Sequence, residues 1–283
     1  MDQVGVILWL QSFGSPAVDA FWKAVTWLGE EDFFLLAIPV VYWCLDAALA
    51  LRVGLLYFFS VAVNTGAKDL FNTPRPSPQE VRIVLEGTGP AFPSGHTQAA
   101  TVFWGFLATQ VKSRWLPWLA GILIVLVGVS RVYLGAHWPE DVLGGWGIGL
   151  ILVGLAAWFY GQWQRRGWRL SLPWQLGLAF LEPILLFALH ANADTSRALG
   201  AGMGVLLGYA LMLRLVGSFP VRGPLWQQVI KLAIGYAGLL ALRFGLKALL
   251  PSLLLADFLR YAVMGLWAAL LAPWIFKRLL RSS

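Results

Sequence analysis

Two histidines stand where the chain could bring a nucleophile and a proton donor together. His96 ends the tetrapeptide Pro-Ser-Gly-His directly before an apolar segment, and His137 lies in a polar stretch between two further apolar segments. Asp141 follows His137 by four positions, across a helix start marked by Pro139. A carboxylate there can accept a hydrogen bond from an imidazole N–H, which sets the tautomer of the ring and favours its protonated form.

Three cations and a helix start accompany these histidines. Lys68 and Arg75 belong to the run KDLFNTPRP, and Arg131 opens the polar stretch that holds the second histidine. Ser94 can cap the helix that follows it and leave the backbone N–H groups from Gly95 onward facing outward, an arrangement that binds anions. Cations and amide donors together fit a tetrahedral oxyanion such as phosphate.

Each motif taken alone also has an ordinary explanation. Lys68 and Arg75 can extend to a membrane interface, the tetrapeptide can be a simple helix cap, and Glu140 and Asp141 can complement a helix dipole. Because the three motifs occur together in one chain, a catalytic site is favoured over these separate explanations. Because no carboxylate cluster or Cys–His set suggests a metal, the residues predict metal-independent phosphoryl transfer through a phosphohistidine, with no cofactor.

The composition places this chemistry in a membrane. Of the 283 residues, 59% are hydrophobic and only 12% are charged. A water-soluble enzyme of this size needs more polar surface, and disorder requires few apolar residues and high charge. The net charge of +7 is better explained by membrane-surface Lys and Arg than by nucleic acid. The single Cys44 excludes a disulfide framework.

The apolar segments predict an all-α, polytopic transmembrane helical bundle. We expect about nine spans, since each segment is close to the length that crosses a bilayer as a helix. Residues 1–29 differ, because Gly14, Ser15 and Pro16 divide them and the second half reads as a helix in the interface. The expected spans are 33–49, 53–72, 97–111, 116–134, 142–162, 173–191, 196–214, 225–247 and 258–276.

The basic residues orient these spans. They gather on the side where the first span ends, whereas the other side carries the acidic run Glu30-Glu31-Asp32. By the positive-inside rule the basic side is cytoplasmic, so the N-terminus and the three polar motifs lie outside and the C-terminus inside. The cytoplasmic group comprises Arg52, Lys112, Arg114, Arg165, Arg166, Arg169, Arg214, Arg222, Lys231, Lys277, Arg278 and Arg281.

The three motifs, in this order, resemble the type 2 phosphatidic acid phosphatase (PAP2) superfamily. The pattern is K-x6-RP from Lys68, then PSGH at 93–96, then SR-x5-H-x3-D from Ser130 to Asp141. The superfamily includes membrane lipid phosphatases, undecaprenyl-diphosphate phosphatases and glucose-6-phosphatase. The resemblance implies an N-terminal interfacial region at 1–29, a catalytic core at 30–165 and additional transmembrane helices at 166–283.

The resemblance also implies a role for each motif residue. His137 corresponds to the nucleophile, Asp141 to its orienting carboxylate, and His96 to the general acid that later activates water. The remaining motif residues correspond to donors that hold the phosphoryl oxygens, and these are Lys68, Arg75, Ser94, Gly95 and Arg131.

The expected protein is therefore a phosphatase acting on a lipid phosphate or isoprenoid diphosphate at the extracytoplasmic face of a bacterial inner or plasma membrane. The bilayer and its phosphorylated lipid are the expected partners, nucleic acid is not, and the oligomeric state is left open. Two alternatives remain open. One is a sugar-phosphate phosphatase like glucose-6-phosphatase, which has a similar number of spans. The other is a lipid transporter or flippase with a vestigial site.

Overall fold

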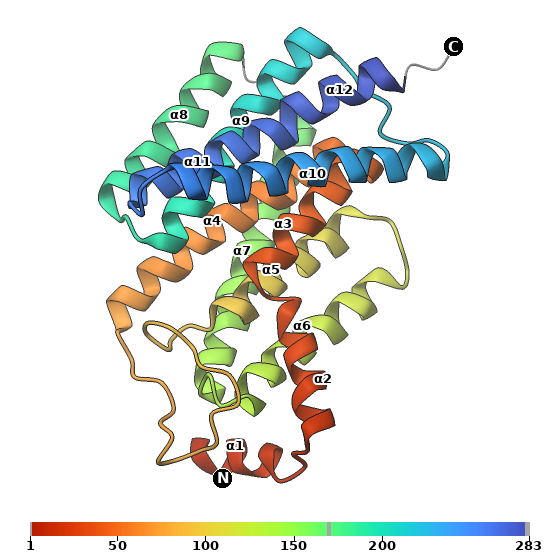
Figure 1. The fold of residues 1–283 in the computed structure, drawn as a ribbon. Coiled ribbons are helices and arrows are strands. Elements are labelled where there is room, and N and C mark those ends of the chain that lie inside the picture. The colour runs from red at the N-terminus through yellow and green to blue at the C-terminus, as the bar shows by residue number, and fades with distance from the viewer. Residues whose placement is uncertain (1, 169–170, 281–283) are drawn as a thin grey trace. The chain divides into compact units, whose positions relative to one another are not determined.

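A computed structural model describes residues 2–168 and 171–280 of the chain, and every regular element in these two ranges is helical (Figure 1). Its internal contacts divide the chain into two compact units. Unit 1 comprises Met1–Leu35 and Val63–Arg166, and unit 2 comprises Leu36–Ala62 and Gly167–Ser283. The three-part division expected from the sequence stays a prediction.

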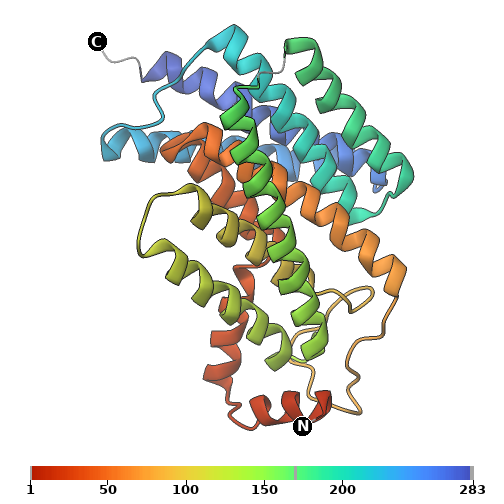
Figure 2. The ribbon, with the colours of Figure 1, turned by 180° about the vertical axis from the view of Figure 1, so that it is seen from behind.

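Unit 1 is built around three helices that lie side by side. Helix α5 packs against both α6 and α7 (Figure 2). Helices α1 and α2 pack against the end of this group. The unit consists of α1 (Gln3–Gln11), α2 (Pro16–Trp27), the beginning of α3 (Glu31–Val40), the end of α4 (Ala47–Phe71), α5 (Gly95–Gln110), α6 (Leu116–Tyr133) and α7 (Pro139–Arg166).

Small residues let α7 approach α5 closely. A Cβ atom on Gly145 would lie 2.8 Å from the carbonyl oxygen of Ser94, and one on Gly149 would lie 2.7 Å from the Cβ of Thr101. Close backbone approach through small residues is how helices associate where lipid removes the hydrophobic drive between them. The contact brings the beginnings of α5 and α7 together, and both beginnings carry motif residues.

The N-terminal helices are attached to unit 1 by polar contacts. As the sequence predicts, Ser15 caps α2 by accepting a hydrogen bond from the amide of Val18, and Pro16 is its first residue. Arg82 donates two hydrogen bonds to Asp19, at 2.8 and 2.9 Å, and the Tyr133 hydroxyl donates a third at 2.5 Å. These bonds hold α2 on the loop before α5 and on the end of α6.

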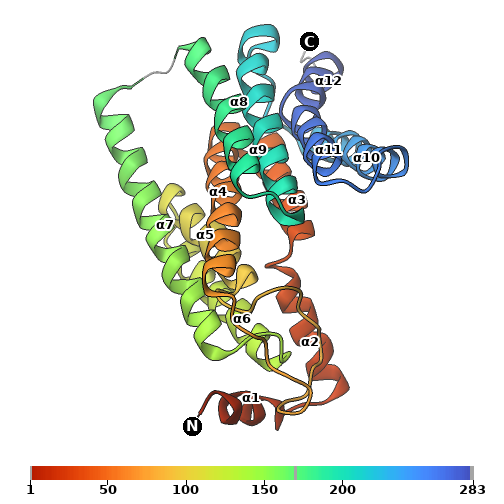
Figure 3. The same ribbon diagram turned by 90° about the vertical axis from the view of Figure 1, so that its left-hand side faces the viewer.

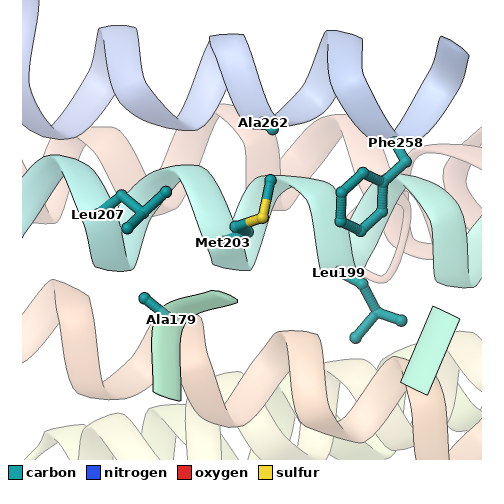
Figure 4. Packing of buried hydrophobic residues seen from close by; sticks show 6 residues of the cluster. All are labelled: Ala179, Leu199, Met203, Leu207, Phe258 and Ala262. Atoms are coloured by element: carbon teal, nitrogen blue, oxygen red, sulfur yellow. The ribbon is translucent and has the colours of Figure 1, made fainter. Parts of the chain in front are cut away.

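Unit 2 is a second helical group in which α9 lies between α8 and α11 (Figure 3). Figure 4 shows its core, made by Ala179, Leu199, Met203, Leu207, Phe258 and Ala262. The helices of the unit after residue 166 are α8 (Leu172–Leu189), α9 (Ala193–Leu211), α10 (Leu225–Leu249), α11 (Leu254–Leu266) and α12 (Ala272–Leu279). Three π-helical turns complete it, η1 (Val41–Leu45), η2 (Met212–Val216) and η3 (Trp267–Leu271).

Lys231 was predicted to be one of the cytoplasmic cations, but it lies inside unit 2. Its side chain is fully buried in unit 2. The ammonium group donates hydrogen bonds of 2.8, 2.9 and 2.7 Å to the carbonyls of Trp43, Pro220 and Val221. It therefore joins the π-helical turn η1 to the segment before α10, and its charge is directed to the protein interior.

The polytopic helical architecture is confirmed, with fewer long helices than expected. In the described residues seven helices are long and apolar enough to cross a membrane, or eight if the bent pair α1 and α2 counts as one span. The expected span 33–49 is wrong in extent, because η1 ends at Leu45 before the extended residue Asp46. Helix α5 has only 16 residues. Of the predicted cytoplasmic cations, Arg169 and Arg281 lie outside the described residues.

Candidate active site

His137 is held between a carboxylate and a guanidinium group. Its Nδ1 lies 3.3 Å from Oδ2 of Asp141, and its Nε2 lies 3.1 Å from a terminal nitrogen of Arg75. Both His137 and Asp141 are buried. Because a guanidinium group only donates, Nε2 is the unprotonated nitrogen and Nδ1 carries the proton toward Asp141. This tautomer leaves the Nε2 lone pair as the nucleophilic position.

The charges around His137 keep its ring neutral. Burial lowers the pKa of His137 well below its usual value, and the positive charges of Arg131, Arg75 and Lys68 lower it further. A neutral imidazole can attack an electrophile, whereas an imidazolium cannot. Burial and the same cations that would bind an oxyanion therefore keep the ring in the neutral form that a nucleophile needs.

The turn between α6 and α7 fixes the position of His137. The carbonyl of Arg131 accepts hydrogen bonds from the amides of Ala136 and His137, so the chain reverses tightly after α6. Gly135 has a φ of +71° in this turn, a value that favours glycine, and a Cβ there would also meet the carbonyl of Arg82. Asp141 lies in the first turn of α7 and accepts a 2.8 Å hydrogen bond from the amide of Trp138.

The start of α5 meets the start of α7. The amide of Ser94 donates a 2.9 Å hydrogen bond to the carbonyl of Asp141. Ser94 occupies the N-cap position and Gly95 is the first helical residue, but the Ser94 hydroxyl makes no capping bond. It accepts a 2.9 Å bond from the hydroxyl of Thr97 instead. The expected cap is thus correct in position and wrong in chemistry, because Thr97 engages the hydroxyl.

Arg131 is a buried cation whose guanidinium group can bind an anion. It lies in the last turn of α6 with 2% of its surface exposed. One terminal nitrogen donates a 2.9 Å hydrogen bond to the hydroxyl of Thr26. Its Nε has no hydrogen-bond partner among the residues that the structure describes. A buried guanidinium donor of this kind is suited to an anionic oxygen.

Lys68 and Arg75 come from the end of α4 and the loop after it. Lys68 is in the last turn of α4, and its charge acts on both His96 and His137. Arg75 follows in the loop, where its guanidinium also donates to the carbonyls of Thr88, Gly89, Pro90 and Ala136. The structure therefore brings all the predicted site residues into unit 1.

An open hollow lies next to Arg75. Its volume is about 440 Å³, and its walls are Asn72, Thr73, Pro74, Arg75, Gly89 and Pro90. The indole N–H of Trp138 donates a 3.0 Å hydrogen bond to the carbonyl of Pro74, which ties this wall to the residue after His137. Trp138 therefore shapes the loop that presents Arg75.

Two contributors to the site were missed in the sequence. Thr26 bonds to Arg131, and Glu30 places Oε1 2.8 Å from Nε2 of His96. Thr26 lies in the region 1–29 that was expected to be interfacial, and Glu30 is the first residue of the expected catalytic core at 30–165. One signal was present, since an acidic run is unusual in a chain with so few charges. Nothing in the spacing indicates which of its members turns toward His96.

Two models of known families match the chain. The family model described as the PAP2 superfamily matches residues 49–165. A second, described as the PAP2 superfamily phosphatase transmembrane extension, matches residues 196–282. Together they cover more than half of the chain. The chain belongs to the PAP2 superfamily. Its predicted motif residues, from Lys68 to Asp141, all fall within the first match.

Several PAP2 proteins are similar to the chain. It is 29% identical over 254 residues to a probable sphingosine-1-phosphate phosphatase of Dictyostelium discoideum, covering 81% of this chain and 61% of that protein. It is 28% identical to mouse sphingosine-1-phosphate phosphatase 2, covering 90% of this chain and 75% of that protein. The first of these relatives is thus matched over less than two thirds of its own length.

A solved structure shares the fold of the PAP2 part. It is the crystal structure of a transmembrane PAP2-type phosphatidylglycerolphosphate phosphatase from Bacillus subtilis, which is 26% identical to this chain. The TM-score is 0.50, and the match covers 56% of this chain and 85% of that one. The chain is therefore an integral membrane protein with a PAP2 helical fold.

Proposed function

We propose that this protein is an integral-membrane phosphatase that hydrolyses a lipid phosphate through a phosphohistidine, at the extracytoplasmic face of the membrane. The observation that carries the proposal is the position of His137, whose Nδ1 faces Asp141 while its Nε2 faces Arg75. A neutral, oriented imidazole among several cations is what attack on a phosphoryl group requires.

In the first step Nε2 of His137 attacks phosphorus. The new P–N bond forms as the bond from phosphorus to the lipid oxygen breaks, and His96 gives its proton to that oxygen. Lys68, Arg75, Arg131, the hydroxyl of Ser94 and the amide of Gly95 hold the three remaining phosphoryl oxygens. Asp141 stabilises the positive charge that develops on the His137 ring.

In the second step water attacks the phosphohistidine. His96, which is now neutral, takes a proton from the water molecule. The water oxygen bonds to phosphorus as the P–N bond breaks. Inorganic phosphate leaves, and His137 returns to its neutral form. His96 is protonated again, so both residues are ready for the next substrate.

The class of substrate is inferred from the relatives and from the bilayer. The relatives named above are described as phosphatases of sphingosine 1-phosphate and of phosphatidylglycerolphosphate, which are both phosphate monoesters on lipids. A site at the ends of membrane helices suits a substrate whose tail stays in the lipid. A lipid phosphate monoester therefore ranks above an isoprenoid diphosphate or a sugar phosphate.

The decisive experiment is phosphate release by the purified protein in detergent. We expect turnover of sphingosine 1-phosphate or phosphatidylglycerophosphate without added metal, and we expect His137→Ala to abolish it. The substrate panel also holds phosphatidic acid, undecaprenyl diphosphate and glucose 6-phosphate. Equal rates for the wild type and His137→Ala would refute the proposed site, and preference for glucose 6-phosphate would refute the lipid substrate.

A further inference from the structure

The connection between α2 and α3 contacts two of the proposed active-site residues. Thr26, in the last turn of α2, accepts a hydrogen bond from Arg131. Glu30, directly before α3, lies 2.8 Å from the imidazole Nε2 of His96 through its Oε1. One short segment therefore meets both the buried guanidinium and the second histidine.

The approach of this segment depends on the glycine next to Glu30. A Cβ atom on Gly29 would lie 2.9 Å from the Cβ of His96 and 3.0 Å from both its carbonyl oxygen and Cγ1 of Val127. These distances are tighter than ordinary side-chain contacts allow. The backbone at residue 29 can therefore lie directly on α5 and α6 only because it has no side chain.

Aromatic and aliphatic packing holds the segment in place on both sides of Glu30. Before it, Val25 packs with Ala100 of α5 and Val127 of α6 in a buried cluster. After it, the rings of Phe33 and Phe34 contact Phe103 at centroid distances of 5.8 and 5.4 Å. The Glu30 backbone is thus fixed relative to α5, the helix that carries His96.

We propose that Glu30 is a positioning residue for His96, so that each of the two histidines of the site has its own carboxylate. This inference rests on the proposed function, in which His96 donates a proton to the leaving oxygen. The contact occupies Nε2 of His96, so Nδ1 is the ring nitrogen that exchanges protons with the substrate. The N-terminal segment is then part of the catalytic machinery.

The charges around His96 explain why such a carboxylate is needed. Burial lowers the pKa of His96, the positive charges of Arg131 and Lys68 act in the same direction, and Glu30 opposes them. The other titratable groups of the site are the neutral ring of His137 and the carboxyl group of Asp141 that contacts it. The contact with His96 in turn lowers the pKa of Glu30, which keeps it a carboxylate at neutral pH. Glu30 therefore favours the imidazolium form that a general acid requires.

The two histidines have opposite requirements, and their carboxylates differ accordingly. Asp141 is buried beside a ring that must start neutral, and it orients the nucleophile. Glu30 has a side chain that is 42% exposed and lies beside a ring that must start protonated. A partly solvated carboxylate retains its charge at little desolvation cost, so it can favour that protonated state.

The experiment compares two substrates in the full-length protein in detergent. The alkoxide of dodecyl phosphate needs a proton in order to leave. With this substrate we expect Glu30→Gln to lower kcat about tenfold at neutral pH, which is a fraction of what a general acid contributes. In the pH–rate profile of Glu30→Gln, we expect the descending limb to move to lower pH. With p-nitrophenyl phosphate, whose leaving group needs no proton, we expect a rate close to that of the wild type.

The control is Glu31→Gln, which removes the neighbouring carboxylate by the same exchange of atoms. We expect it to keep the wild-type pH profile with both substrates. An unchanged pH profile in Glu30→Gln overturns the inference. An equal loss of rate with both substrates also overturns the inference, because that pattern indicates damaged folding. An equal effect of Glu31→Gln overturns it as well.

The failure of this inference is distinguishable from failure of the proposed function. His96→Ala is measured with dodecyl phosphate in the same series. If His96→Ala is inactive while Glu30→Gln behaves as the wild type, only the role of Glu30 is wrong. If His96→Ala keeps the wild-type rate, the proposed role of His96 as general acid is wrong, and the role of Glu30 falls with it.

Discussion

At the residue scale, the site is organised by what each neighbour of His137 can do with a proton. Arg75 can only donate, and Asp141 as a carboxylate can only accept. Placed at opposite nitrogens, 3.1 and 3.3 Å away, they leave one tautomer of the ring. The same two residues thus set both the position and the protonation of the proposed nucleophile.

Replacing Asp141 by Asn tests this arrangement. The amide oxygen can still accept the hydrogen bond from the Trp138 amide, so we expect the α7 start to keep its shape. The negative charge that favours the Nδ1–H tautomer and stabilises the developing imidazolium is lost, and we expect kcat to fall about 10³-fold or more, as for other histidines deprived of their carboxylate. Steady-state kinetics on a lipid phosphate measures the change, with KM expected to stay nearly constant.

The matched control is Glu140→Gln, which removes the exposed carboxylate beside Asp141 in the same helical turn. Glu140→Gln removes the same negative charge from the α7 start as Asp141→Asn does, but it does not alter a contact with the ring of His137. We expect its kcat to be close to that of the wild type. If Asp141→Asn lost less than tenfold, or if both variants lost the same amount, orientation by Asp141 would be the wrong explanation.

At the element scale, the glycines of α7 decide how the two motif-bearing helix starts meet. Gly145 and Gly149 are spaced by one turn and both face α5, where Ser94 and Thr101 leave no room for a side chain. Gly147 lies on the same helix, and a Cβ there would meet nothing within 4 Å. The helix therefore has a packing face and an open face within three residues.

These two faces provide a matched pair of substitutions. We expect Gly149→Leu to push α7 away from α5 and to lower kcat/KM about 100-fold, since a displacement of about 1 Å at a catalytic group can cost that much. We expect Gly147→Leu to retain the wild-type rate. Phosphate release and thermal unfolding in detergent are measured for both. Equal losses in the two variants would show that α7 tolerates no large side chain, rather than that its packing on α5 matters.

At the scale of the whole molecule, the uneven distribution of charge predicts the orientation in the membrane. Within unit 1, the loop from Asn72 to Ser94 precedes α5 and carries site residues, while the loop after Gln110 contains the basic residues Lys112 and Arg114. Positive loops are retained in the cytoplasm. This distribution predicts that the site lies outside, where outer-leaflet lipids can reach it.

Cysteine accessibility checks the orientation in intact cells. Cys44 is the only native cysteine, so a Cys44→Ala background is free of thiols. In that background we expect Gln79→Cys to react with a membrane-impermeant maleimide in whole cells. We expect Ser113→Cys, which is also exposed, to react only after permeabilisation. The reverse pattern would place the site in the cytoplasm and contradict the proposed sidedness.

Much of the architecture was available from the sequence because it depends on local composition. Apolar segments predict that helices exist, and Ser15 and Pro16 predict where α2 begins, whatever these helices pack against. The segment 33–49 was misjudged because apolar content does not reveal where the helix stops, and it stops before Asp46.

The sequence by itself determined which chemistry to expect, since a phosphate site is predicted by the types and spacing of Lys68, Arg75, His96, Arg131, His137 and Asp141. Only the tertiary structure decided which groups complete it. Glu30 and Thr26 belong to no motif, and they contact His96 and Arg131 where Gly29 lets one backbone lie on another helix. Contacts between segments distant in sequence arise from packing, and periodicity along the chain carries no record of them.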